Sequence, residues 1–296
     1  MIVDPNNKDL LKAGKIASEV REFAKSLTVK GAKLLDITKA TEKKIIDLGG
    51  KIAFPPQLSL NHIAAHYYPD FNDTIILNDE VVKIDVGVHV NGYIGDTACT
   101  VDLSGKNKKV VDASRQALNE AIKIIKPGIT IAKIGETIQK TISSFGLAPV
   151  KNLSGHGLGL YKIHESPSIP NYDSGETITL EENQLIAIEP FATNGVGMIQ
   201  EGTSSTLFSL IKKRPIRMQS SRNLLKFILN NYGDLVFAKR WLRNHFKPVE
   251  LEFALRDLLR NEIIRWHPPL GEKANGLVSQ AEHTVIVMNK PKIITL

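Results

Sequence analysis

The chain has 296 residues, of which 42% are hydrophobic and 23% are charged, a composition typical of a globular protein with ample core for one or two domains. Its first residues contain no apolar segment of the secretory kind, and no run approaches the ~18 apolar residues of a membrane span. A single cysteine, Cys99, excludes an internal disulfide, so we expect a cytoplasmic protein without a membrane partner.

The first half of the chain predicts two helices, a hairpin and two more helices. Apolar residues at helical spacing place the helices over residues 7–27, 33–48, 108–125 and 131–145. The prolines of 53–70 predict an irregular stretch with a short strand ending near His66. Between the helix pairs, two apolar runs flank Asn91-Gly92, which predicts a hairpin over 81–101.

The two helix pairs repeat one another. Residues 31–49 align without gaps on 128–146, always 97 residues apart, and both segments are bounded by glycines. An apolar strand ending in an acid follows each pair, with Asp85 in the first half and Glu189 in the second. The alternative is a chance likeness of two amphipathic helix pairs. A true repeat predicts two related halves that meet at a pseudo-twofold axis, with a site at their junction.

The rest of the second half contains a glycine-rich segment, two strand regions and a basic insert. Residues 152–170 carry His156 in a glycine loop, 184–190 predict a strand, and 195–210 predict a hairpin-like pair. The segment 211–265 holds thirteen Lys or Arg against five Asp or Glu, with short helices over 221–231, 235–244 and 251–264. Strand character returns over 277–288. The fold class is therefore α+β, with a helical insert between two strands of the main domain.

Four acids lie in apolar strand contexts and require a common explanation, because a charge in such a strand is costly unless it is paired or bound to a metal. They are Asp85, Asp96, Glu189 and Glu282. Together with His156 they suit divalent ions such as Mn, Fe, Co or Zn, and two ions can share carboxylates. For any single acid, a buried hydrogen-bonded carboxylate is the simpler interpretation. The sequence lacks a phosphate-binding loop, a dinucleotide fingerprint and a serine-nucleophile elbow.

In order and context, these five residues resemble the metal ligands of the pita-bread metallopeptidases (family M24), and more narrowly those of type II methionine aminopeptidases. The resemblance spans nearly the whole chain through FPPQLSLNHIAAHYYP, KIDVGVHVNGYIGDTA, GHGLGLYKIH, AIEPFATNG and QAEHT. The spacing of eight between His156 and His164, and the insert between Glu189 and Glu282, favour type II. Two departures, GHG for the commoner GHS and Ala281 before the last glutamate, remove no ligand.

The resemblance implies a role for each matching position. Asp96 and Glu282 would bridge two divalent ions (Co, Mn, Fe, Ni or Zn), with His156 and Glu189 completing one ion and Asp85 the other. Glu189 would also act as the general base toward the bridging water. His66 and His164 would contact the scissile peptide, whereas His62 is interpreted as a surface or packing residue. Phe54, Ile163 and His267 match positions that line the methionine pocket, although each could equally be core packing.

The implied protein is a monomeric pita-bread enzyme with a catalytic domain over 1–206 and 277–296 and a basic helical insert over 207–276. It would remove the initiator methionine from nascent proteins with a small second residue. One alternative is an X-Pro dipeptidase of the same fold, and another is a non-catalytic nucleic-acid-binding relative. A weak ribosome contact through the insert stays open beside its alternative, a solvated basic face.

Overall fold

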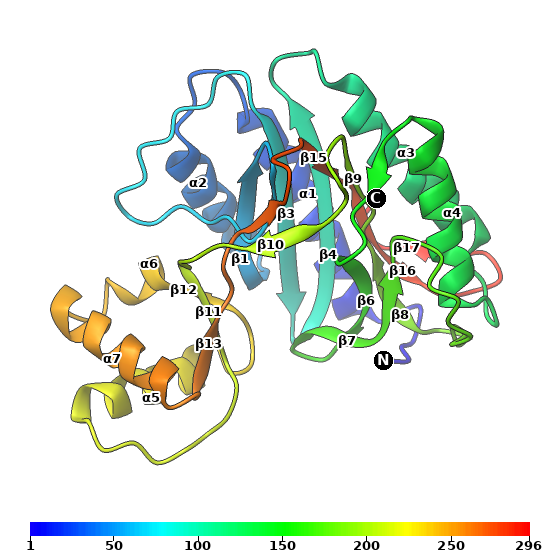
Figure 1. Cartoon of the computed structure of the whole chain (residues 1–296). Helices are drawn as coiled ribbons and strands as arrows, with labels where there is room; N and C mark the ends of the chain where they lie inside the picture. The colour runs from blue at the N-terminus through cyan, green and yellow to red at the C-terminus, as the bar shows by residue number, and fades with distance from the viewer.

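A curved antiparallel sheet forms the centre of the computed structural model, which describes all residues 1–296 (Figure 1). Seven of its strands follow one another in the order β1-β3-β4-β16-β8-β6-β7, and β17 pairs with β16. Their bounds are β1 Lys51–Leu60, β3 Val81–Val90, β4 Tyr93–Asp102, β6 Ser154–Gly159, β7 Lys162–Pro170, β8 Leu185–Ile188, β16 Glu282–Ile286 and β17 Lys292–Ile293.

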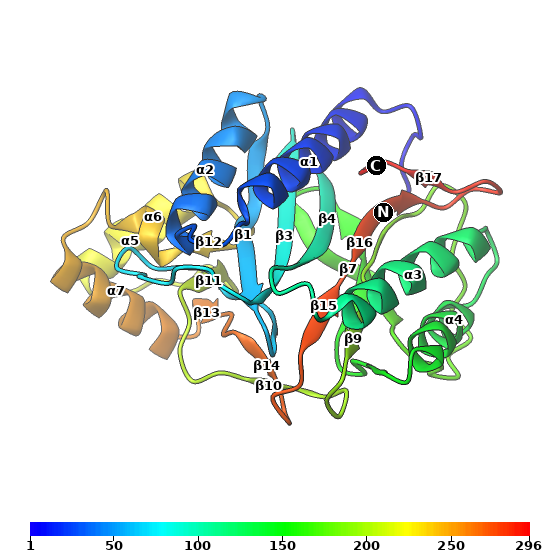
Figure 2. The ribbon, with the colours of Figure 1, turned by 90° about the horizontal axis from the view of Figure 1, so that it is seen from above.

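Four helices cover one face of this sheet (Figure 2). They are α1 Lys8–Leu27, α2 Leu34–Asp47, α3 Lys108–Ile124 and α4 Ile131–Ser144. The helices α1 and α2 share one apolar core with β3, whereas α3 and α4 share a second core with β8 and β16. The amphipathic spacing read from the sequence therefore builds two helix-on-sheet layers. No helix of the chain is both long and apolar enough to span a membrane.

The predicted repeat is visible in the backbone. The bounds of α2 and α4 differ by 97 residues at both ends. Gly31 and Gly128 precede these helices with φ of 84° and 82°, and each donates its N–H to a leucine carbonyl, of Leu77 and Leu180 respectively. Positive φ is readily accessible to glycine, which explains why both positions keep it. The two helices and the turns that precede them are therefore equivalent in structure as well as in sequence.

Two segments that we expected to be irregular or loops are strands in the structure. Residues 53–60, expected to be irregular because of Pro55 and Pro56, belong to the ten-residue strand β1. This strand lies at the edge of the sheet and accommodates both prolines in the register shift between Phe54 and Gln57, as edge strands can. The glycine loop around His156 is instead the pair β6–β7. Gly155 and Gly157 are needed there because a Cβ would meet backbone oxygens at 2.4 and 2.3 Å.

Three small sheets complete the structure, two of them in the main body. The first contains β10 Ile199–Glu201, β14 Leu270–Glu272 and β2 Ile63–Ala65, with β14 in the middle. The second contains β15 Val278–Gln280, β9 Phe191–Thr193 and β5 Ala148–Pro149. The expected hairpin over 195–210 is wrong, because β10 pairs with β14 whereas β11 (Leu207–Leu210) pairs in the third sheet.

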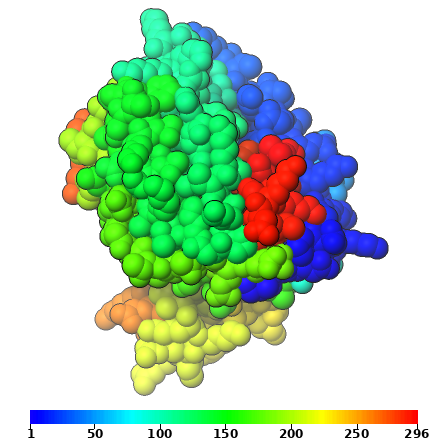
Figure 3. All heavy atoms as spheres, turned by 90° about the vertical axis from the view of Figure 1, so that its right-hand side faces the viewer, coloured from blue at the N-terminus to red at the C-terminus, as the bar shows by residue number.

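The third sheet belongs to the insert, which projects from the main body as the yellow and orange region of Figures 1 and 3. It joins β11 to β12 Phe237–Ala238 and β13 Ile264–Trp266, beside α5 Gln219–Asn231, α6 Lys239–Leu242 and α7 Pro248–Arg260. The expected helix over 235–244 is largely replaced by β12 and the short α6. Twelve buried apolar residues between Phe208 and Ile264 give the insert its own core. The domain limits near residues 207 and 276 stay a prediction.

Candidate metal centre

Three of the four predicted acids meet around one residue of the central strand β4. Asp85 on β3 and Glu282 on β16 are both opposite Ala98 of β4, one from each side. Asp96 lies two residues before Ala98 on the same strand, so its side chain is on the same face of the sheet. The hairpin β3–β4 supplies two acids, and β16 brings the third from nearly 200 residues away.

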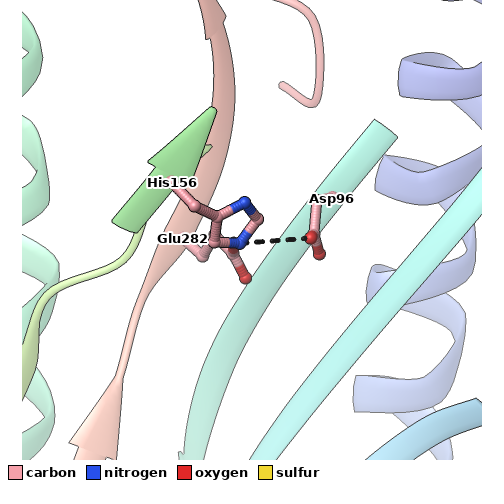
Figure 4. Close-up of side chains that lie close together, drawn as sticks. All are labelled: Asp96, His156 and Glu282. Carbon is pink, nitrogen blue, oxygen red and sulfur yellow. Dashed lines mark ion pairs between the residues drawn. The ribbon is translucent and has the colours of Figure 1, made fainter. Parts of the chain in front are cut away.

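The two remaining predicted ligands come from the neighbouring strands of the second half. His156 on β6 is opposite Ala187 of β8, and Glu189, two residues after Ala187, directly follows the end of β8. Ligand atoms of Asp96, His156 and Glu282 lie within 4.8 Å of one another (Figure 4). The His156 Nε2 lies 3.9 Å from Asp96 Oδ2 and 3.5 Å from Glu189 Oε1.

Asp85 joins this group through an amide. The side chain of Gln280 is buried, and its Nε2 donates to Asp85 Oδ2 at 3.4 Å and to Glu189 Oε2 at 3.5 Å. Both contacts are long and the amide carries no charge, so Gln280 orients the two carboxylates but leaves their negative charges uncompensated. The structure therefore brings all five predicted ligands together, three as a tight group and two held beside it.

The four carboxylates of this buried group favour the binding of cations. Burial raises the pKa of Asp85 to about 7. Burial, and then repulsion from the neighbouring carboxylates, raises the pKa values of Asp96, Glu189 and Glu282 well above their ordinary range. The Oδ1 atoms of Asp85 and Asp96 are buried without a hydrogen-bond donor. Since unpaired buried oxygens are destabilising, four carboxylates and one imidazole in this arrangement fit divalent ions.

His156 is held in the form that binds a metal. Its Nδ1 lies 3.1 Å from the carbonyl oxygen of Gly157, which can only accept a hydrogen bond. The proton is therefore on Nδ1, and the lone pair of Nε2 points toward Asp96 (Figure 4). Burial, together with the neighbouring His164, lowers the pKa of His156 to about 3, so the ring is neutral near pH 7.

A cavity of about 710 Å³ opens over the five ligands. Its walls include all the other residues predicted from the resemblance, which are His66, His164, Phe54, Ile163 and His267. His62 does not line it, in agreement with its interpretation as a packing residue. Leu207 and Val236, from the start of the insert and the segment before β12, add apolar wall. The main domain and the insert therefore enclose the cavity jointly.

His66 is fixed more tightly than its sequence context suggests. It has a φ of 66°, its backbone N–H donates to Gln57 Oε1 at 2.6 Å, and its Nδ1 lies 3.3 Å from the Pro268 carbonyl oxygen. A left-handed conformation in a non-glycine residue is strained and is common at functional sites. Burial lowers its pKa to about 4. The imidazole of His164 packs edge-on against His156, with ring centroids 4.6 Å apart.

Two residues of the site were not identified from the sequence. Gln57 and Gln280 are neutral amides in strand-like segments, and they act on other site residues only after the strands pair. Gln280 lies two residues before Glu282, but the two residues belong to strands of different sheets, since β15 ends at Gln280 and β16 begins at Glu282. Their roles depend on pairing over long sequence distances, which a local pattern does not reveal.

The chain matches the metallopeptidase family M24 over residues 8–213. It is 45% identical to a methionine aminopeptidase of Methanocaldococcus jannaschii over 287 residues, with 97% of each chain covered. It is 42% identical to a methionine aminopeptidase of Archaeoglobus fulgidus, with 99% of each chain covered. The chain therefore belongs to the M24 metallopeptidases. These matches confirm the predicted family and its enzyme class, a metallopeptidase hydrolase.

Solved structures confirm the pita-bread fold. A methionine aminopeptidase from Thermotoga maritima superposes with a TM-score of 0.72 at 22% identity, covering 100% of this chain and 99% of that one. A thermophilic Arx1 superposes with a TM-score of 0.85 at 18% identity, covering 99% and 91%. A prolidase from Pyrococcus furiosus gives 0.63 at 20% identity and is covered over 65% of its length. At these identities the likeness concerns the fold alone.

Proposed function

We propose that this protein is a metal-dependent aminopeptidase that removes the N-terminal methionine from nascent polypeptides with a small second residue. The observation that carries the proposal is the buried group of four carboxylates and one neutral imidazole at the floor of the 710 Å³ cavity. Its support from relatives is the name methionine aminopeptidase, which full-length archaeal chains with 40–45% identity carry.

The ligand set supports a site for two divalent ions. Asp96 and Glu282 come from β4 and β16, which lie between the strands of the other ligands in the sheet, and this suits carboxylates shared by both ions. His156 and Glu189, 3.5 Å apart, would complete one ion, and Asp85 on the other side of Ala98 would hold the second. One ion would leave several buried negative charges uncompensated, whereas two would balance them. The ligands suit Co, Mn, Fe, Ni and Zn alike.

When bound, divalent ions supply a polarised peptide carbonyl and a water of lowered pKa. The chain's own residues perform the remaining steps. Glu189 lines the cavity, and with the ions bound its ionised carboxylate would take up the proton of the attacking water. Its orientation is fixed by Gln280 Nε2, 3.5 Å from Oε2. The same carboxyl then delivers the proton to the leaving amine.

The two histidines at the cavity wall act as neutral hydrogen-bonding groups. Because the Pro268 carbonyl only accepts, Nδ1 of His66 carries the proton and Nε2 is left as an acceptor, suited to the N–H of the scissile peptide. Burial lowers the pKa of His164, which keeps its ring neutral, and we assign it to the carbonyl oxygen of the same bond. The buried metal floor admits only a chain end, whose free amine would bind near Asp85.

The apolar part of the cavity suits an unbranched thioether side chain. Phe54 and Ile163 are buried residues of its wall, and His267 stands opposite His66 with ring centroids 5.8 Å apart. Sulfur packs favourably on aromatic rings, so we assign these three residues to the methionine pocket. The His267 ring is held by Ser209, whose Oγ lies 2.9 Å from Nε2.

We further place the enzyme in the cytoplasm as a monomer, where nascent chain ends are its partners. The charge of the insert supports a weak contact with ribosomal RNA, since thirteen Lys or Arg within 211–265 face only five acids. Sedimentation with ribosomes should then weaken as the salt concentration rises about tenfold, from roughly 20 to roughly 200 mM. Absence of co-sedimentation at the lowest salt would remove this contact.

Peptide turnover tests the main proposal. Metal-free protein would be supplied with each ion in turn and given Met-Ala-Ser or the dipeptide Met-Pro, while bound metal is counted by elemental analysis. We expect release of methionine from Met-Ala-Ser, two ions per chain at saturation and little cleavage of Met-Pro. Preferential cleavage of Met-Pro would instead support the X-Pro dipeptidase alternative. Turnover of neither peptide with any ion would favour a non-catalytic role.

A further inference from the structure

A second cavity of about 330 Å³ adjoins the first and leads outward. The two share five wall residues, which are His66, Asn152, Leu153, His267 and Leu270. The second cavity adds Ile199 and Glu201 of β10 on one side and Arg265 and Trp266 of β13 on the other. Trp266 is 47% exposed, so this cavity connects the catalytic histidine wall to the surface.

One side of this cavity is an unpaired sheet edge. In the sheet β10-β14-β2, strand β10 has a partner on only one side. The Met198 carbonyl accepts from Lys273 N, and Gly202 N donates to the Pro269 carbonyl, so the even-numbered residues bond toward the β14 side. The alternation of an antiparallel pair then turns the N–H and C=O groups of residues 199 and 201 toward the open edge.

Asn152 shows that this edge accepts a strand-like partner. Its side-chain Nδ2 donates to the Ile199 carbonyl at 2.8 Å, and its Oδ1 accepts from Ile199 N at 2.8 Å. The amide thus occupies the place of one residue of a neighbouring strand. Glu201, the next edge-facing residue, is exposed and lines the second cavity. Asn152 lies in both cavities, so a chain leaving the first passes it and reaches Glu201.

We propose that substrate residues beyond the second bind in this cavity as an extended strand that pairs with the backbone of Glu201, between Trp266 and the edge of β10. The ligand class is an unfolded peptide recognised through its main chain, which gives affinity without sequence preference. Figure 2 shows β10 and β14 together at one side of the sheet, away from the helices. The inference rests on the proposed aminopeptidase function and assigns a binding place to the part of the substrate beyond the scissile bond.

The backbone N–H of Glu201 can be removed by one substitution. In Glu201→Pro the ring eliminates this N–H, and proline is tolerated on an edge strand where the N–H faces outward. Glu201→Ala is the matched control, because it removes the side chain and keeps the N–H. The measured quantity is the ratio of kcat/KM for Met-Ala-Ser-Gly-Ser to that for Met-Ala. We expect Glu201→Pro to lower this ratio about fivefold, the effect of one hydrogen bond, and Glu201→Ala to keep the wild-type ratio.

A second measurement uses the unaltered protein and pentapeptides with a single N-methyl group at the third or fourth residue. One of the two should lose a similar factor, because its N–H would pair with the Glu201 carbonyl. Equal ratios for wild type, Glu201→Pro and both methylated peptides would overturn the inference while leaving the aminopeptidase function intact. Failure of the wild type to cleave either unmodified peptide would instead overturn the proposed function.

Discussion

The two halves of the molecule share a backbone plan but contribute differently to the site. In the first half, β3 and β4 provide Asp85 and Asp96, while the edge strand β1 provides Gln57 and Phe54. In the second half, the strand on the outer side of β8 is β6, which provides the imidazole of His156. The repeat thus fixes where acids lie, and the outer strands divide the remaining tasks. The outer strands of the second half complete the metal group and also add His164 and Ile163 to the cavity wall, to which β1 of the first half adds Phe54 and Gln57.

The helices show the same divergence at aligned positions. Glu42 of α2 corresponds to Gln139 of α4, 97 residues later. Glu42 accepts from Arg240 Nη2 at 2.9 Å and from Trp241 Nε1 at 2.8 Å, and both donors belong to the insert. Gln139 accepts only from the backbone N–H of Asp173 in a surface loop. One half therefore carries the insert and the other does not, although their helices are alike.

The largest expected effect, on turnover, comes from substitution of Glu282, the acid on β16 between the two halves. Glu282→Gln should lower turnover of Met-Ala-Ser at least about a hundredfold, because it removes the charge of a carboxylate that we propose as a ligand of both ions. The metal-free protein should keep its fold, since the change also relieves repulsion among buried carboxylates. Peptide assays and circular dichroism measure both. The exposed Asp79→Asn is a control, and equal turnover in both variants would contradict the ligand assignment.

Substitution of Glu42, which binds Arg240 and Trp241 of the insert, should have the next largest effect. Glu42→Gln removes the negative charge from a nearly buried pair in which both side chains are 12% exposed. Leaving Arg240 without its partner should lower the free energy of unfolding by about 3 kcal/mol, measured in urea. The aligned variant Gln139→Ala should cost less than about 1 kcal/mol, because its hydrogen bond is exposed. Equal costs would show that the insert is not held by Glu42.

Glu272 also connects the two halves, and the stability that its hydrogen bonds provide depends on pH. The Glu272 backbone N–H donates to His62 of the first half, and its carboxylate accepts from Val196 and Gly197 of the second. Burial opposes ionisation, but the hydrogen bonds from these and two further backbone N–H groups lower its pKa. The stabilisation is therefore present above the unfolded value near 4.3 and is lost as pH falls through the folded pKa.

Glu272→Gln should accordingly cost about 2 kcal/mol near pH 7, and the difference from wild type should shrink below about pH 4. Urea unfolding at several pH values measures it. Glu176, an exposed acid in a surface loop, gives the matched control Glu176→Gln, which should show little difference at any of these pH values. If the loss of unfolding free energy in Glu272→Gln stayed the same below about pH 4, the charge of Glu272 would not stabilise the contact between the halves.

The smallest effect is expected where the halves differ only on the surface. Lys43 and Lys140 are aligned, and they pair with Asp47 and Glu136 in opposite directions along their helices. Since exposed pairs contribute little, Lys43→Ala and Lys140→Ala should each change Tm by less than about 1 °C in calorimetry. A shift of several degrees in either would indicate that the surface pairs help to distinguish the halves.

The repeat also explains which features could be predicted from sequence. The helices recur 97 residues apart, and the acid-ended strands of Asp85 and Glu189 recur 104 residues apart, so local patterns reveal both. Strand β1 and the pair β6–β7 were expected as irregular or loop segments, because Pro55 and the glycines beside His156 are ordinarily signs of loops. The glycines allow close backbone approach and the prolines fall in a register shift of an edge strand, and both reasons appear only once the strands are paired. Gln280 was missed for the same reason, since its two partners are distant in sequence.

The junction of β4 with β16 has a consequence for synthesis of the protein. Each half has its own core, so the first can fold while the second is still being made. The metal group, however, needs Glu282 beside Ala98, and this contact spans most of the chain. A growing copy therefore gains its peptidase chemistry only after Glu282 has left the ribosome and β16 has entered the sheet between the halves.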